Sequence, residues 1–145
     1  MGDGKLKNHL IQRINSSELR KKVTVVGNIP YVKMNKEYEN ADVLVFCSLR
    51  ESSGTVILEA MKNALPIIAL NRFGAALILD NDNSWKITGN SLEELKKSFT
   101  EAIVECCEHP MVMRKKGQQA FLDAYSLTWS KKVSFYQQLY ESILK

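Results

Sequence analysis

Two carboxylates, Glu51 and Glu59, lie eight positions apart around a stretch of small residues. Apolar residues take up helical spacing just after Gly54 and Thr55, which predicts that a helix begins there. The free N–H groups and the positive dipole end of a first helical turn favour an anion such as phosphate. Glu59 follows Thr55 by four residues and so lies one turn down on the same face. A carboxylate there can accept hydrogen bonds from both hydroxyls of a ribose while the helix start holds phosphates.

The segment from residue 41 to residue 70 supplies the elements that would position these groups. Residues 43–46 form a short apolar run, typical of a buried parallel strand, and residues 47–53 are polar and without period. The helix that follows ends before Pro66, because proline disfavours the helical conformation in its predecessor. Residues 67–70 are a second apolar strand. A loop and a helix start at the carboxyl end of a parallel strand is where open α/β sheets bind ligands.

The whole thirty-residue string carries a family resemblance that two glutamates alone would not. Glu51, seven residues and Glu59 are preceded by Ala-Asp-Val-Leu-Val-Phe-Cys-Ser and followed by Ala-Met-Lys-Asn-Ala-Leu-Pro-Ile-Ile-Ala. This pattern resembles the C-terminal, donor-nucleotide-binding domain of the group 1 (family 4) retaining glycosyltransferases, which have the two-Rossmann-domain GT-B fold. The resemblance extends over nearly the whole chain, from Gly2-Asp3-Gly4 to Trp129.

The resemblance implies a role for each matching residue. Glu51 would be the catalytic residue that contacts the transferred sugar near its anomeric carbon, and Glu59 would bind the ribose. Backbone N–H groups of small residues would meet sugar hydroxyls and phosphate. A further loop would lie against the nucleobase, although apolar packing explains that loop equally well. The implied donor-binding residues are Ser53, Gly54, Thr55, Val56, Glu59, Ile29 and Pro30.

The sequence departs from the family pattern at three places. Residues 52–54 are Ser-Ser-Gly where Gly-Phe-Gly is common, and residues 73–75 are Phe-Gly-Ala where Gly-Gly-Pro is usual. Ala64-Leu65 replaces the usual glycine before Pro66. The first two changes border the sugar, so they leave the family assignment intact and bear on which sugar is bound.

Composition narrows the function classes. The 145 residues are 45% hydrophobic and 25% charged, with a net charge of +4, which is typical of a globular protein. Basic runs no longer than three residues argue against a nucleic-acid partner. The three cysteines lack zinc or disulfide spacing and indicate a reducing, cytoplasmic location, with peripheral association at the inner membrane face as a further option. No apolar run is long enough for a membrane span.

Strands that alternate with helices predict a Rossmann-like three-layer αβα domain over residues 1–145. Four buried parallel strands are expected, at residues 23–26, 43–46, 67–70 and 85–88. Relative to the family, the N-terminal acceptor domain and the first strand, helix and second strand of this domain have no counterpart. We therefore expect the strands at 23–26 and 43–46 to pair directly into a truncated half of a GT-B fold. Dimerisation through the open edge is the second expectation.

We consider two functions of different classes for this sequence. The first is the nucleotide-sugar-binding part of a retaining, metal-independent glycosyltransferase without cofactor, which moves a sugar to a glycan, lipid or other hydroxyl acceptor. The chain alone is then expected to be inactive, since the acceptor and diphosphate-gripping segments lie outside it. The second is a receiver-like signalling domain, which needs acidic residues at its strand ends. The strand ends here are Gly27, Cys47 and Leu70, so the first function is favoured.

Overall fold

The computed structural model describes residues 2–49 and 54–144, and the chain divides into two compact units. The first unit, Met1–Glu37, holds the helix α1 (Lys7–Asn15), the 3₁₀ helix η1 (Glu18–Lys21) and most of α2 (Tyr31–Glu39). The break between α1 and η1 falls at Ser16 and Ser17, where the apolar helical period of the sequence is interrupted.

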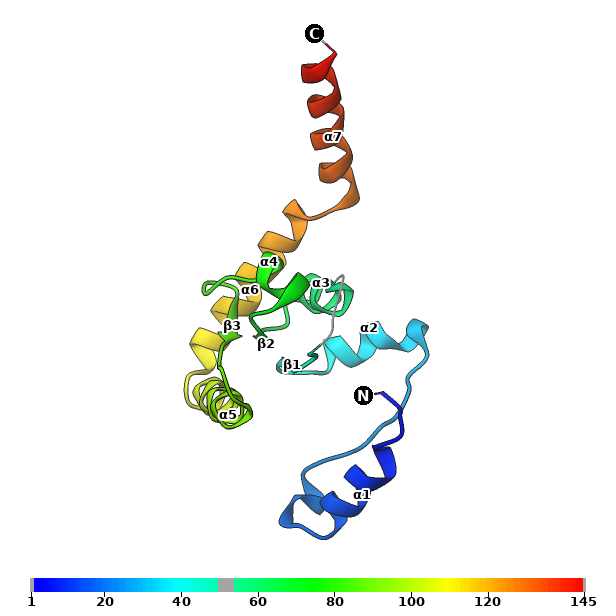
Figure 1. Cartoon of the computed structure of the whole chain (residues 1–145), viewed down its shortest axis with the longest axis vertical. Coiled ribbons are helices and arrows are strands. Elements are labelled where there is room, and N and C mark those ends of the chain that lie inside the picture. Colours follow the sequence, from blue (N-terminus) through cyan, green and yellow to red (C-terminus); the bar gives the residue numbers. More distant parts are fainter. Residues whose placement is uncertain (1, 50–53, 145) are drawn as a thin grey trace. The chain divides into compact units, whose positions relative to one another are not determined.

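The second unit, Tyr38–Lys145, contains the sheet and the remaining helices (Figure 1). Its elements in chain order are β1 (Leu44–Phe46), α3 (Thr55–Lys62), β2 (Ile67–Leu70), α4 (Phe73–Ile78), β3 (Ser84–Ile87), α5 (Leu92–Glu108), α6 (Pro110–Ser126) and α7 (Trp129–Ile143).

The sheet is parallel, with the order β1-β2-β3. Val45 pairs with Ile68, and Ile68 pairs with Trp85, so the three strands are in register along one row. All four residues of the central strand β2 are buried, as expected for a strand covered on both faces. Short crossovers through α3 and α4 make the parallel pairing possible.

Helices cover the two faces of the sheet and give the predicted αβα layers. Alternate residues of β2 face opposite ways. On one face, Ile68 and Leu70 pack with Trp85 and Ile87 of β3 against Ala102 and Cys106 of α5. On the other face, α3 and α4 contact β2, and α6 packs along α3 (Figure 1). The α/β fold class is therefore confirmed, with three strands among the described residues in place of the expected four.

The strand expected at residues 23–26 does not form, so the prediction of a buried strand there is wrong. The segment forms no ladder, and Val23 and Val26 expose 41% and 54% of their surface. The predicted pairing of this segment with the strand at 43–46 is also wrong. Among the described residues, β1 pairs only with β2. An apolar run becomes a strand only where a neighbour takes its backbone hydrogen bonds. Just after the segment 23–26, the Gly2 N–H donates to the Gly27 carbonyl at 2.7 Å.

The cysteines and the cap of α5 test smaller expectations. Ser-Leu-Glu-Glu at residues 91–94 has the pattern of a capping box and predicts a helix start, which is confirmed because Ser91 Oγ accepts from the Glu94 N–H at 3.1 Å. Cys106 is buried and its neighbour Cys107 is exposed, as helical geometry requires. Burial raises the pKa of the Cys106 thiol to about 11. The position of Cys47 at the end of an apolar run predicts a small buried hydrophobe, and this prediction is wrong, because Cys47 lies beyond the end of β1 and is exposed.

Candidate functional site

Helix α3 begins where the sequence predicts, and its start depends on a glycine. Gly54 is the N-cap residue and adopts a left-handed conformation, with φ +65°. Residues with a Cβ are disfavoured there. A Cβ would also lie 3.0 Å from the Cδ1 of Ile78 in α4, so the residue must stay small for packing as well. The chain therefore turns sharply at Gly54, where α3 begins.

The first turn of α3 presents backbone donors at the carboxyl end of the sheet. The Gly54 carbonyl accepts from the N–H groups of Ile57 and Leu58, at 2.9 and 3.1 Å. Among the described residues, no acceptor takes the N–H of Val56, and that residue is half-buried. Thr55 is exposed at the first helical position. A helix start of this kind can donate to a phosphate or to a sugar hydroxyl.

Glu59 lies one turn further along α3 and is half-buried. Its Oε2 accepts a hydrogen bond of 2.9 Å from the hydroxyl of Tyr38, a buried residue near the end of α2. Tyr38 is not among the site residues predicted from the sequence. Its only signal was an aromatic ring with a polar tip on the short helix before the strand at 43–46, and no spacing rule connects residues 21 positions apart.

The structure places the other predicted residues in two groups. Gly54, Thr55, Val56 and Glu59 lie together on the first turns of α3. Ile29, which is half-buried, and Pro30, which is exposed, belong to the first unit. Both precede α2, which begins at Tyr31. The residues Glu51 and Ser53 lie outside the described residues, and their roles stay predictions.

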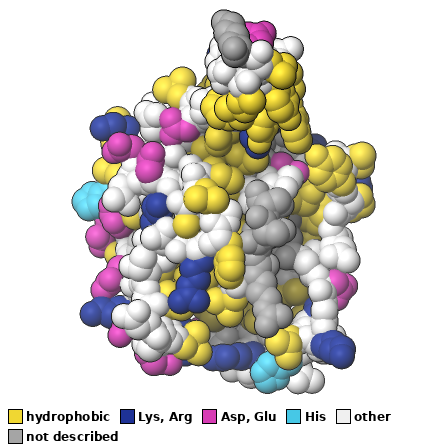
Figure 2. Space-filling view, turned by 45° about the horizontal axis from the view of Figure 1, so that its top comes forward, with side chains coloured by type: hydrophobic (Ala, Val, Ile, Leu, Met, Phe, Trp, Pro, Cys, Tyr) yellow, Lys and Arg dark blue, Asp and Glu magenta, His cyan; other side chains and the backbone are white. Residues whose placement is uncertain are grey.

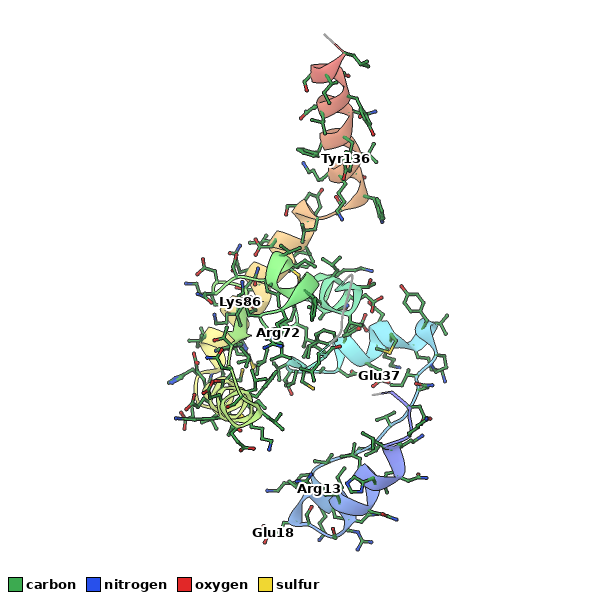
Figure 3. The ribbon with its side chains drawn as sticks, viewed as in Figure 1. Arg13, Glu18, Glu37, Arg72, Lys86 and Tyr136 are labelled. Carbon is green, nitrogen blue, oxygen red and sulfur yellow. The ribbon has the colours of Figure 1, made fainter. Side chains whose placement is uncertain are left out.

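Two basic side chains of the second unit, Arg72 and Lys86, belong to the end of β2 and to β3 (Figure 3). Lys86 is on β3, and its Nζ donates to the Ala76 carbonyl of α4 at 3.4 Å, which ties the two elements together. Arg72 follows β2 immediately before α4 and is exposed. Arg72 therefore presents a cation to solvent where β2 ends.

The described residues contain no group of three or more His, Cys, Asp or Glu side chains that could hold a metal ion. Across the same residues, the helices lack either the length or the apolar character needed to cross a bilayer.

The fold is similar to that of solved glycosyltransferase structures. A sucrose-phosphate synthase from Thermosynechococcus elongatus superposes with a TM-score of 0.76 and 24% identity over 97% of this chain and 34% of its own. The pneumococcal O-GlcNAc transferase GtfA, solved with UDP and GlcNAc, gives 0.78 and 16%, over 97% of this chain and 28% of its own. The C-terminal domain of a group 1 glycosyltransferase from Francisella tularensis gives 0.70 and 22%, over 83% of this chain and 61% of its own. These likenesses establish the fold.

Sequence comparison identifies the family. The GPI3 subunit of the phosphatidylinositol N-acetylglucosaminyltransferase of Saccharomyces cerevisiae is 28% identical over 102 residues, which are 70% of this chain. The chain spans only 23% of the length of that relative. The family model described as "Glycosyl transferases group 1" matches residues 1–120. The chain therefore belongs to the group 1 glycosyltransferase family.

Proposed function

We propose that this chain is the donor-nucleotide-binding part of a retaining, metal-independent glycosyltransferase. The observation that carries the proposal is the start of α3, in a chain of this family. There the left-handed Gly54 aims helix N–H groups at the carboxyl edge of a parallel sheet, and the Glu59 carboxylate lies one turn below. This pairing of donors and acceptor fits a phosphate attached to a ribose diol.

The comparisons support a nucleotide sugar as the donor. The solved structures of the pneumococcal O-GlcNAc transferase GtfA and of Anabaena HepE contain UDP, together with GlcNAc in the first and glucose in the second. A uridine diphosphate sugar is accordingly the first donor to test.

The proposed reaction needs no protein nucleophile. The diphosphate leaves on the face that the acceptor hydroxyl attacks, so positioning and charge stabilisation lower the barrier. Glu51 would orient the sugar and stabilise positive charge at its reacting carbon. The N-terminus of α3 would stabilise the negative charge on the leaving phosphates, while Glu59 holds the ribose. No metal or other cofactor enters this scheme.

The acceptor and the rest of the enzyme are further parts of the proposal. We assign to this chain the C-terminal, donor-side domain, and to segments beyond it the acceptor site and the grip on the diphosphate. The name of the yeast relative supports a lipid-linked acceptor at a membrane surface as one candidate. On this view the chain alone does not transfer sugar.

Calorimetric titration of the 145-residue chain with UDP, in buffer that contains EDTA and no magnesium, tests the proposal. Glu59→Ala should weaken binding by about 1–3 kcal/mol, because charge-assisted hydrogen bonds to the ribose are lost. Glu51→Ala should leave UDP affinity nearly unchanged, because its proposed partner is the sugar, which UDP lacks.

Glu93→Ala provides the matched control, since Glu93 is an exposed glutamate on another helix, with a surface ion pair to Lys96. If Glu51→Ala weakened UDP binding and Glu59→Ala did not, the proposed roles of the two glutamates would be contradicted. A thermal shift caused by beryllofluoride with magnesium, and none with UDP, would instead support the receiver-like alternative.

A further inference from the structure

The Glu59 carboxylate is held by one side chain from a different helix. The Tyr38 hydroxyl donates to Glu59 Oε2 at 2.9 Å, and Tyr38 retains only 4% of its surface. Among the described residues, no other side chain or backbone N–H donates to this carboxylate, and no Lys or Arg forms an ion pair with it. The direction of the carboxylate therefore depends on Tyr38.

We propose that Tyr38 is a positioning residue, which fixes the Glu59 carboxylate in the direction needed to accept both hydroxyls of a ribose. This inference rests on the proposed function of Glu59. A free glutamate side chain loses about 1–2 kcal/mol of rotamer entropy when it is ordered. A buried tyrosine has only two side-chain torsions, and packing fixes both, so it can order the glutamate before the ligand arrives.

Counting acceptor sites shows that the contact leaves room for a diol. An ionised carboxylate has two oxygens and about four lone-pair directions. Tyr38 occupies one direction of Oε2. Oε1 and the second direction of Oε2 remain for two hydroxyl donors. The tyrosine thus orients the carboxylate without competing with the ligand.

The hydrogen bond between Tyr38 and Glu59 also has a purely structural explanation. A buried tyrosine hydroxyl needs an acceptor, and Glu59 would then only satisfy the hydroxyl of Tyr38. The two readings differ in what the tyrosine does for a ligand that has ribose hydroxyls and for one that lacks them.

The experiment compares UDP with 2′,3′-dideoxyuridine diphosphate on the 145-residue chain, before and after Tyr38→Phe. The phenylalanine keeps the ring and removes the donor. We expect UDP affinity to fall about three- to tenfold, the size of one hydrogen bond's contribution. Affinity for the dideoxy analogue should stay the same within error. In a Glu59→Ala background, Tyr38→Phe should cause no further loss of UDP affinity, because the two residues act as one unit.

Two further variants distinguish the loss of the hydrogen bond from a general packing defect. Tyr140→Phe, on the exposed face of α7, should leave both affinities unchanged. Tyr38→4-fluorophenylalanine fills the volume of the hydroxyl without donating, so it replaces Tyr38→Phe if that variant unfolds. Both Tyr38 variants should lose the preference for ribose.

The outcomes separate this inference from the proposed function. If the unaltered chain prefers UDP over the dideoxy analogue and the Tyr38 variants keep that preference, the positioning role is overturned while the function of Glu59 stands. Equal losses for both ligands would also overturn it, in favour of the packing role. If the unaltered chain binds no UDP or shows no ribose preference, the proposed role of Glu59 fails, and the role of Tyr38 fails with it.

Discussion

Helices α3 and α7 both carry an apolar stripe, but the described structure covers only the first. Ile57, Ala60 and Met61 of α3 are buried between β2 and α6. No residue of α7 is buried. Figure 2 shows hydrophobic side chains gathered on α7 at the top of the view. The exposed apolar residues of that helix are Trp129, Val133, Phe135, Tyr136, Leu139, Tyr140 and Ile143.

The difference teaches which part of the chain can hold a site in place. The stability of a helix in a protein comes mainly from packing of its apolar face, not from its intrinsic propensity. Helix α3 meets this condition, so Gly54 and Glu59 are attached to a packed element. The aromatic contacts of α7 join its own residues, since Phe135 contacts Tyr136 and Lys132 lies over Trp129.

The largest expected effect comes from truncating a buried residue of α3. Ile57→Ala should lower the free energy of unfolding by about 2–5 kcal/mol, because it removes fully buried methylenes and leaves a cavity. The matched change on α7, Val133→Ala, should cost less than about 0.5 kcal/mol, because Val133 is 52% exposed. Urea unfolding followed by fluorescence measures both. Similar losses at the two positions would mean that α7 is packed in solution.

The contact of α3 with α6 gives the next effect. A Cβ added to Gly117 of α6 would lie 2.2 Å from the carbonyl oxygen of Ala64, just after α3. Gly117→Ala should therefore push the helices apart and cost about 1–3 kcal/mol or more. Gly4→Ala is the control, because nothing lies within 4 Å of a Cβ there. An unchanged unfolding midpoint for Gly117→Ala would show that α3 and α6 are not in close contact.

Much of this packed region could be predicted from the sequence, because its signals are local. Apolar runs gave the strands at 43–46, 67–70 and 85–88 to within one residue, and Gly54 marked the start of α3. The segment 23–26 has the same apolar character but no strand beside it, and apolar character alone does not supply a partner.

The candidate site was predictable to the extent that it follows the helix start. The order of Gly54, Thr55, Val56 and Glu59 along the chain fixes their arrangement on α3. The hydrogen bond from Tyr38 to Glu59 joins residues 21 positions apart, and no local pattern encodes such a contact. The departures from the family pattern were also visible. Ala64 and Phe73 stand at or beside usual glycine positions, and both adopt left-handed conformations, with φ 52° and 53°.

Replacing Ala64, just after α3, should have a smaller effect of opposite sign, a gain in the free energy of unfolding. The N–H of Ala64 donates to Met61 and that of Leu65 to Ala60, which is the Schellman arrangement that favours glycine at the position of Ala64. Ala64→Gly relieves about 1–2 kcal/mol of left-handed strain and loses part of this to unfolded-state entropy. A net gain of about 0.5–1 kcal/mol is expected in urea unfolding. Ala76→Gly, inside α4, should instead destabilise, and a loss at position 64 would contradict the strained geometry.

The smallest effect is expected from removing α7 altogether. A chain that ends after Thr128 loses no side chain that is buried among residues 129–144, so its free energy of unfolding should change by less than about 0.5 kcal/mol. The deletion also removes Trp129, and Trp85, one of the two tryptophans of the chain, then reports alone on the core beside β3. Urea unfolding followed by its fluorescence should match that of a Trp129→Phe chain of full length. A loss above about 1 kcal/mol would show that α7 is packed in solution. If that loss depends on protein concentration, the surface that covers α7 belongs to a second copy, and if it does not, the surface lies within the chain itself.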